Sequence, residues 1–306
     1  MITYYLKTIK EPVLKTVPEF QIGAWIYVES PTEKEIGGLA AQFSLNSALL
    51  TDAIDPFEAP RLEVEDKITY VYTRVPFSGK EETRTVPLLV AVGETFLLTV
   101  ASNPLPFLNR FFDEKIAFHT TQKTKLFLQL FLYLARSYES FLTSINKEVR
   151  SASVNLEQVA EKDILRFVRF ESTLNDFLAA LVPTNTILQS LLGGKALHLY
   201  DEDEDLVEDL MLQNKQSIEL AKATSQTIGN IRNTYSTIVT NNLNDVIRLL
   251  TALTIIFTIP TTIASFFGMN IRLPLENSPY AFWIIGGFAI IISLTLAVIF
   301  VRNRWL

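Results

Sequence analysis

The sequence contains no cysteine and only two histidines, His119 and His198, among its 306 residues. The absence of cysteine excludes disulfides and thiolate metal sites and is compatible with a reducing compartment such as the cytosol. Two imidazoles are too few for a zinc site of the usual kind within one chain. The net charge of −6 argues against a nucleic-acid partner, because such partners need basic surfaces. The sequence also lacks a P-loop, a nucleophile elbow and a His-carboxylate cluster, so we do not expect an enzyme.

Long hydrophobic runs are found only near the C-terminal end of the sequence. One extends from Val246 to Phe267 and the other from Tyr280 to Val301. Each run is long enough for a helix that crosses the hydrocarbon core of a bilayer, which takes about 20 residues. We therefore expect an integral membrane protein with transmembrane helices at 246–267 and 280–301, a connecting loop at 268–279 and a tail at 302–306.

The charged residues around these runs predict the orientation of the chain. Arg248, Arg302 and Arg304 flank the two spans, whereas the connecting loop holds one cation, Arg272, and one anion, Glu276. The positive-inside rule then places both termini in the cytoplasm and the loop outside the cell membrane. The first residues show no basic segment followed by a long apolar run, so we expect no signal peptide.

The part of the chain before the spans predicts an α/β domain followed by helices. Strand-like runs at 24–28, 68–72, 87–92 and 95–100 are rich in β-branched and aromatic residues, and helical stretches lie near 32–50 and 104–115. The short step across Gly93-Glu94 predicts a hairpin and hence a mixed sheet. Helices are expected at about 118–156 and 158–192, the second with a break near Pro183.

The acidic run Asp201–Asp205 suits the first turn of a helix, because negative charge stabilises a helix N-terminus. From there to Phe267 the sequence predicts one helix of about 65 residues, which would be about 100 Å long. We assign 1–200 to a cytoplasmic α/β domain with its following helices and 201–245 to the cytoplasmic part of a stalk. The fold class is therefore α+β, with a C-terminal transmembrane hairpin.

The first span carries a polar stripe that the second span lacks. The positions are spaced alternately by four and three residues, which places them on one face of a helix: Thr240, Asn244, Ile247, Thr251, Thr254, Thr258, Thr261 and Ser265. Such a stripe is typical of a helix that lines a water-filled path shared by several copies. Small hydroxyl residues also allow transmembrane helices to pack closely, and the stripe alone leaves both explanations open.

Gly268-Met269-Asn270 closes the first span just before a short loop and a final helix, and in this it resembles the CorA metal-ion transporter superfamily. The preceding segment 260–267, with sequence PTTIASFF, is also similar to that family. So are the segments 206–209 (LVED), 215–216 (KQ) and 241–244 (NNLN) of the stalk, and Thr51-Asp52 followed by 60–63 (PRLE). The resemblance covers essentially the whole chain and is most specific in its last third.

The resemblance implies a homopentamer whose long helices form a funnel and a pore, with the second spans as an outer ring. It implies Mg²⁺ as the usual ion, often with Co²⁺ and Ni²⁺. Asn270 would lie in a ring at the outer mouth, where a neutral amide oxygen can accept hydrogen bonds from the waters of the ion. Gly268 is expected to allow the tight backbone at the helix end, with Met269 packed behind it.

Further roles follow from the same resemblance. Ile247 and Leu250 match a hydrophobic constriction that gates by dewetting, and Asn244 matches a polar ring beside it. Asn244 and the hydroxyl residues Thr251, Thr254, Thr258, Thr261 and Ser265 would line the pore. Asp209 and Asp52 match carboxylates that meet between subunits and bind a regulatory Mg²⁺. Loss of that ion would leave like charges to push the subunits apart, which opens the funnel.

Two alternatives to an Mg²⁺ channel remain open at this point. A ZntB-like Zn²⁺ transporter shares the fold and the Gly-Met-Asn motif, although the sequence has few soft or borderline ligands. A membrane-anchored scaffold would explain the helices but not the hydroxyl stripe or Asn270. The loop after Asn270 reads IRLPLEN and lacks the acidic pair typical of the family, so it is a poor guide to the choice of ion.

Overall fold

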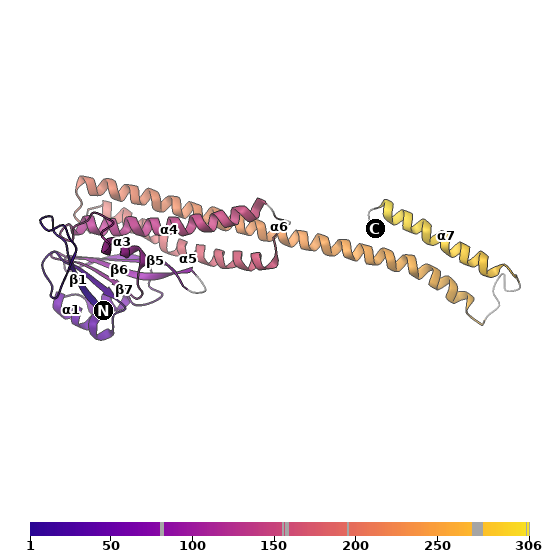
Figure 1. Ribbon diagram of the computed structural model, residues 1–306, viewed down its shortest axis with the longest axis horizontal. Helices are drawn as coiled ribbons and strands as arrows, with labels where there is room; N and C mark the ends of the chain where they lie inside the picture. The colour runs from indigo at the N-terminus through magenta and orange to yellow at the C-terminus, as the bar shows by residue number, and fades with distance from the viewer. Residues whose placement is uncertain are drawn as a thin grey trace. The chain divides into compact units, whose positions relative to one another are not determined.

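The computed structural model describes residues 1–79, 83–154, 156, 159–194, 196–270, 278–303 and 305. It divides into two compact units, Met1–Ile231 and Arg232–Leu306. One helix, α6 (Asp201–Phe267), begins in the first unit and ends in the second, and its 67 residues agree with the single long helix that the sequence predicts (Figure 1). Residues Arg272, Glu276 and Arg304, which entered the prediction of orientation, lie outside the described residues.

The first unit is built on a mixed seven-stranded sheet. Its order is β2-β1-β3-β7-β6-β5-β4, and only the β3–β7 pair is parallel. The predicted hairpin across Gly93-Glu94 is confirmed as the antiparallel pair β6–β7. The strands are β1 (Ile2–Leu6), β2 (Lys15–Val17), β3 (Trp25–Glu29), β4 (Arg61–Glu65), β5 (Ile68–Ser78), β6 (Thr83–Val92) and β7 (Leu97–Ala101).

Helices cover both faces of the sheet. Successive side chains of a strand point to opposite sides, so the buried strands carry apolar side chains on both faces. On one face Ile26, Leu89 and Leu98 pack against α1 (Glu33–Phe43) and α2 (Ser47–Asp52). On the other face Trp25, Leu88 and Val90 pack against the remaining helices of this unit. These are η1 (Pro106–Leu108), α3 (Asn109–Phe112), α4 (Lys123–Val154), α5 (Glu161–Leu192) and the first part of α6. Figure 1 shows the sheet between α1 and the α4–α6 layer.

Three features of the first unit differ from the predictions. The strands β1 and β2 were not expected, and 61–63, expected to precede a strand, form the start of β4 itself. The expected break at Pro183 is absent, since α5 continues from Glu161 to Leu192. Buried residues on both sides of the proline, such as Leu181 and Ile187, hold this helix in the core, so tertiary packing outweighs the local cost of the proline.

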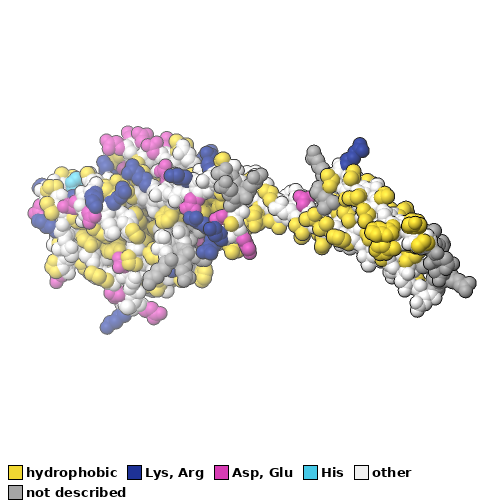
Figure 2. Space-filling model, turned by 45° about the vertical axis from the view of Figure 1, so that its right-hand side comes forward, with side chains coloured by type: hydrophobic (Ala, Val, Ile, Leu, Met, Phe, Trp, Pro, Cys, Tyr) yellow, Lys and Arg dark blue, Asp and Glu magenta, His cyan; other side chains and the backbone are white. Residues whose placement is uncertain are grey.

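The second unit contains the end of α6 and the helix α7 (Ala281–Arg302). Both helices are long and apolar enough to cross a membrane, with mean hydropathies of 1.8 and 2.8 in their most apolar windows. Only 6% of each window is buried within the chain, whereas the core helix of a soluble protein would be mostly buried. Figure 2 shows hydrophobic side chains over these helices, while charged side chains gather on the first unit.

Candidate functional site

The polar stripe of α6 lies on an exposed face of the hairpin. Asn244, the threonines at 251, 254, 258 and 261, and Ser265 are all exposed in the single chain. A shallow hollow of about 470 Å³ follows this face toward the end of the helix. Its lining includes the predicted residues 254, 258, 261 and 265 and also Thr262 and Met269, which the heptad spacing had not selected.

Helix α7 covers a different face of α6. Ala252 is fully buried, Ala289 of α7 is 8% exposed, and the Ser293 hydroxyl of α7 donates a hydrogen bond to the Ile256 carbonyl oxygen. On a helix, positions 252, 256 and 263 lie roughly opposite the stripe, because each residue turns the helix by about 100°. Packing between the two spans of one chain therefore does not explain the hydroxyl residues.

Most threonine hydroxyls of the stripe donate their hydrogens within their own helix. Thr251, Thr254 and Thr261 donate to the carbonyl oxygens four residues earlier, at 2.7, 2.8 and 2.8 Å. A hydroxyl that has donated in this way offers only its oxygen lone pairs to the outside. The exposed face thus presents a column of hydrogen-bond acceptors, which suits water molecules whose hydrogens point outward from a bound cation.

The segment Gly268-Met269-Asn270 directly follows the last residue of α6, Phe267. The Gly268 amide donates to the carbonyl oxygens of Ala264 and Ser265, at 3.0 and 3.1 Å, and Met269 donates to Phe266 at 3.3 Å. Asn270 is exposed, so its amide is accessible beyond the last turn of α6. Met269 is 50% exposed and borders both the stripe and an apolar groove between α6 and α7.

The backbone of a single chain does not require glycine at position 268, contrary to the expectation. A Cβ atom built there would lie 3.5 Å from the Ser265 oxygen and 3.6 Å from the Ala264 oxygen, which are ordinary contacts, and φ is not in the left-handed region. Within one chain, position 268 therefore has room for a larger residue.

The two residues predicted to form a hydrophobic constriction are also exposed. Ile247 is 51% exposed and Leu250 is 64% exposed. Ile247 falls within the stripe, while Leu250 lies beside it, so both can contribute to one apolar ring only if several copies of α6 face one another.

Asp52, predicted to bind a regulatory ion, already has a positive partner. Arg61 of β4 pairs with Asp52 at 2.7 Å and with Glu63 at 2.6 Å, and it also pairs with Glu58. Its guanidinium lies 3.9 Å from the centre of the Tyr72 ring. Burial lowers the pKa of Arg61, but hydrogen bonds to Glu63 and Asp52 outweigh that effect and raise it. Asp52 therefore faces a permanent cation that the sequence motif had not revealed.

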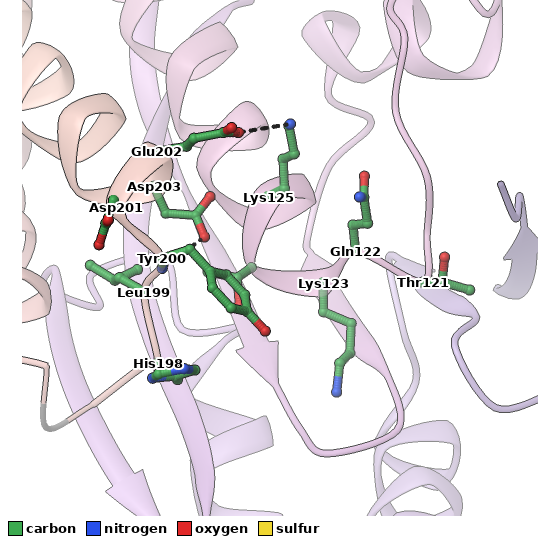
Figure 3. A pocket seen from close by; sticks show the side chains of 11 residues that line it. Thr121, Gln122, Lys123, Lys125, His198, Leu199, Tyr200, Asp201, Glu202 and Asp203 are labelled. Atoms are coloured by element: carbon green, nitrogen blue, oxygen red, sulfur yellow. Dashed lines mark hydrogen bonds and ion pairs between the residues drawn. The ribbon is translucent and has the colours of Figure 1, made fainter.

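Two of the acids at the start of α6, Asp203 and Glu202, have partners within the chain. Asp203 accepts a hydrogen bond from the Tyr200 amide at 3.3 Å, as in a capping box, and Glu202 lies 4.0 Å from Lys125. Figure 3 shows these residues at a cavity of about 880 Å³ between the starts of α4 and α6. These two acids thus have roles in helix capping and surface pairing, whereas Asp209 is exposed on the following turns.

Asp52 and Asp209 belong to different layers of the chain. Asp52 ends α2, on one face of the sheet, while the neighbours of Asp209, Val207 and Leu210, are buried in the core on the other face. Among the described residues, no group of three or more histidine, aspartate or glutamate side chains is placed to hold a metal ion. A site that uses both carboxylates would therefore need two chains.

Comparison with known proteins shows the same architecture elsewhere. The sequence matches the family described as CorA-like Mg²⁺ transporter protein over residues 21–302. It is 24% identical over 294 residues to the cobalt/magnesium transport protein CorA of Methanocaldococcus jannaschii, covering 92% of this chain and 91% of that protein.

Solved structures show the same fold. The complete structure of the CorA magnesium transporter from the same organism aligns with a TM-score of 0.87 at 21% identity, covering 100% of this chain and 99% of that one. The ZntB cytoplasmic domain from Vibrio parahaemolyticus aligns with a TM-score of 0.65 at 10% identity, covering 78% of this chain and 98% of that one.

Proposed function

Because this chain belongs to the CorA-like family of Mg²⁺ transporter proteins, we propose that it conducts hydrated Mg²⁺ across the cell membrane through a pore enclosed by several copies of α6. The observation that carries this proposal is the exposed column of acceptor oxygens on the face of α6 that α7 leaves open. Hydrocarbon chains offer no donors to these oxygens, whereas a water-filled path does.

The copies form a homopentamer in this proposal, with α6 around the axis and α7 outside. Asn270 surrounds the outer mouth, and the hydroxyl stripe follows inside. Mg²⁺ loses its waters reluctantly, so a path that accepts hydrogen bonds from an intact hydration shell lets the ion pass without dehydration. Co²⁺ and Ni²⁺ form hydrated ions of similar kind and are the other expected substrates. The close approach of the copies at the mouth also explains Gly268.

Ile247 and Leu250 form the closed gate of the pore. Apolar rings exclude water when they are narrow, which stops a hydrated ion. Asn244 supplies a polar ring next to this constriction. Both termini lie in the cytoplasm, so the first unit can respond to the intracellular Mg²⁺ concentration.

Ion flux into liposomes tests this function directly. Purified protein should admit Mg²⁺ at a rate that does not change when a pH gradient is imposed. Zn²⁺ entry that rises with a proton gradient, with little Mg²⁺ flux, would instead favour the ZntB-like alternative. If neither ion enters while the protein is folded and oligomeric, the scaffold alternative is supported and the transport proposal is wrong.

We further propose that Asp209 is the main carboxylate through which intracellular Mg²⁺ holds the funnel closed. Asp209→Asn should raise the Mg²⁺ concentration needed for half-maximal protection against protease by about tenfold, the effect of losing about 1.4 kcal/mol of ion binding. Asp52→Asn should have a smaller effect, because that carboxylate already has Arg61 as a positive partner within the chain.

Glu208→Gln provides the matched control for this experiment. It removes the same charge from the adjacent position of α6, about 100° around the helix. Its protection curve should stay close to that of the wild type. Equal shifts for Glu208→Gln and Asp209→Asn would show a general effect of charge, and an unchanged curve for Asp209→Asn would remove Asp209 from the regulatory mechanism.

A further inference from the structure

Pro260 interrupts the hydrogen bonds of α6 within the membrane segment. Proline has no amide hydrogen, so position 260 cannot donate to the Ile256 carbonyl four residues earlier, and its ring also pushes that carbonyl aside. A backbone carbonyl without a donor is costly in a bilayer, where no water can replace the missing bond. The helix therefore needs another donor at Ile256.

Ser293 of α7 supplies a donor at this point. Its hydroxyl lies 3.4 Å from the Ile256 carbonyl oxygen, and the bond is partly buried between the two helices. Thr295, two residues later, behaves differently and donates to the Ile291 carbonyl of its own helix at 2.7 Å. The Ser293 bond is thus directed across the hairpin, to the one carbonyl whose helical partner Pro260 removes.

Residues of both helices line a groove beside this contact. Pro260 and Ile263 of α6 and Gly286 and Ala289 of α7 border one apolar groove. Beyond the proline, the last turns of α6 carry Thr261, Ser265 and the segment 268–270. The direction of α6 after Pro260 therefore decides where the outer end of the stripe and Asn270 lie.

We propose that Ser293 is a positioning residue: by donating to the carbonyl that Pro260 leaves without a helical donor, it fixes the direction of α6 after Pro260 and so the placement of Asn270 at the mouth. This inference deepens the proposed function and rests on it for its consequence for ion entry. The hydrogen bond itself is a property of the hairpin and can be measured separately from transport.

A double-mutant cycle tests the bond in the full-length protein in detergent. Ser293→Ala should lower the melting temperature by about 2–4 °C, the shift typical of a loss of about 1 kcal/mol. In the Pro260→Ala background the same substitution should change the melting temperature by less than about 1 °C, because an alanine amide at 260 restores the helical donor to Ile256. Additive effects in the two backgrounds would overturn the proposal.

Transport measurements then test the positioning role. Ser293→Ala should raise the Mg²⁺ concentration for half-maximal entry by about threefold, whereas a loss of folded protein would lower only the maximal flux. Ser293→Thr, which keeps the hydroxyl, should restore the wild-type value, and Thr295→Ala should leave it unchanged. A change in maximal flux alone, with coupling intact in the cycle, would show that the bond is only structural.

The two measurements separate failure of this inference from failure of the proposed function. If the wild type admits no Mg²⁺ while the double-mutant cycle shows coupling, the bond is present and the transport proposal is wrong. If the wild type admits Mg²⁺ and the cycle is additive, transport holds and Ser293 has no positioning role.

Discussion

Asn270→Ala should reduce Mg²⁺ entry into liposomes by at least about tenfold, which corresponds to about 1.4 kcal/mol or more of lost stabilisation at the mouth. The substitution removes the exposed amide that follows the last turn of α6 from every copy in the pore. The waters around the ion then lose their first hydrogen-bond acceptors, and each such bond contributes about 0.5–1.5 kcal/mol. Initial rates of entry at several Mg²⁺ concentrations measure the effect.

Asn303→Ala is the matched control for this result. Asn303 follows the last turn of α7, and the same side chain is lost there. The Mg²⁺ flux of Asn303→Ala should equal that of the wild type. Both variants should form an oligomer of the same size as the wild type. Undiminished entry in Asn270→Ala would exclude Asn270 from the ion path and would favour the scaffold alternative.

Thr254→Val should lower Mg²⁺ flux by about tenfold while keeping the melting temperature within about 2 °C of the wild type. Valine is β-branched like threonine and has nearly the same shape, while an acceptor oxygen is lost from every copy around the path. The internal bond of Thr254 to the Leu250 carbonyl is also lost, but that carbonyl accepts from the helix backbone as well.

Thr295→Val separates the acceptor role from the internal bond. Thr295 makes the same kind of bond within α7, at 2.7 Å, and it is exposed on the other span. Its replacement should leave flux unchanged. If both valine variants lose stability and flux equally, the hydroxyl residues serve helix packing. If Thr254→Val keeps full flux, the stripe does not line the ion path.

Much of the chain was predictable from periodicity and length. The long helix and both apolar spans follow from long stretches of sequence with few residues that break a helix. The helices α6 and α7 agree with these predictions. The strands β3, β5, β6 and β7 follow from β-branched and aromatic runs. Shorter elements were missed: β2 has only three residues, and β4 begins within the segment 60–63 that was expected to precede a strand.

Local signals failed where distant contacts decide the outcome. Pro183 predicts a break, yet the core around Leu181 and Ile187 keeps α5 continuous. Asp52 as a ligand of a regulatory ion stays a prediction, and only the fold revealed that Arg61 of β4 pairs with it. Gly268 suggested a tight backbone, but its conformation is open to other residues within one chain.

The sequence by itself determined the helical stripe, the two spans and the Gly-Met-Asn segment, because helix periodicity and hydrophobic length are properties of neighbouring residues. It did not determine which face of α6 meets α7, because small hydroxyl residues suit the packing of two helices as well as a water-filled path. Only the tertiary structure showed that Ser293 and Ala289 of α7 lie against one face of α6. The hydroxyl stripe on the other face of α6 stays exposed. That choice depends on side chains far apart in the sequence, which come together only when the hairpin closes.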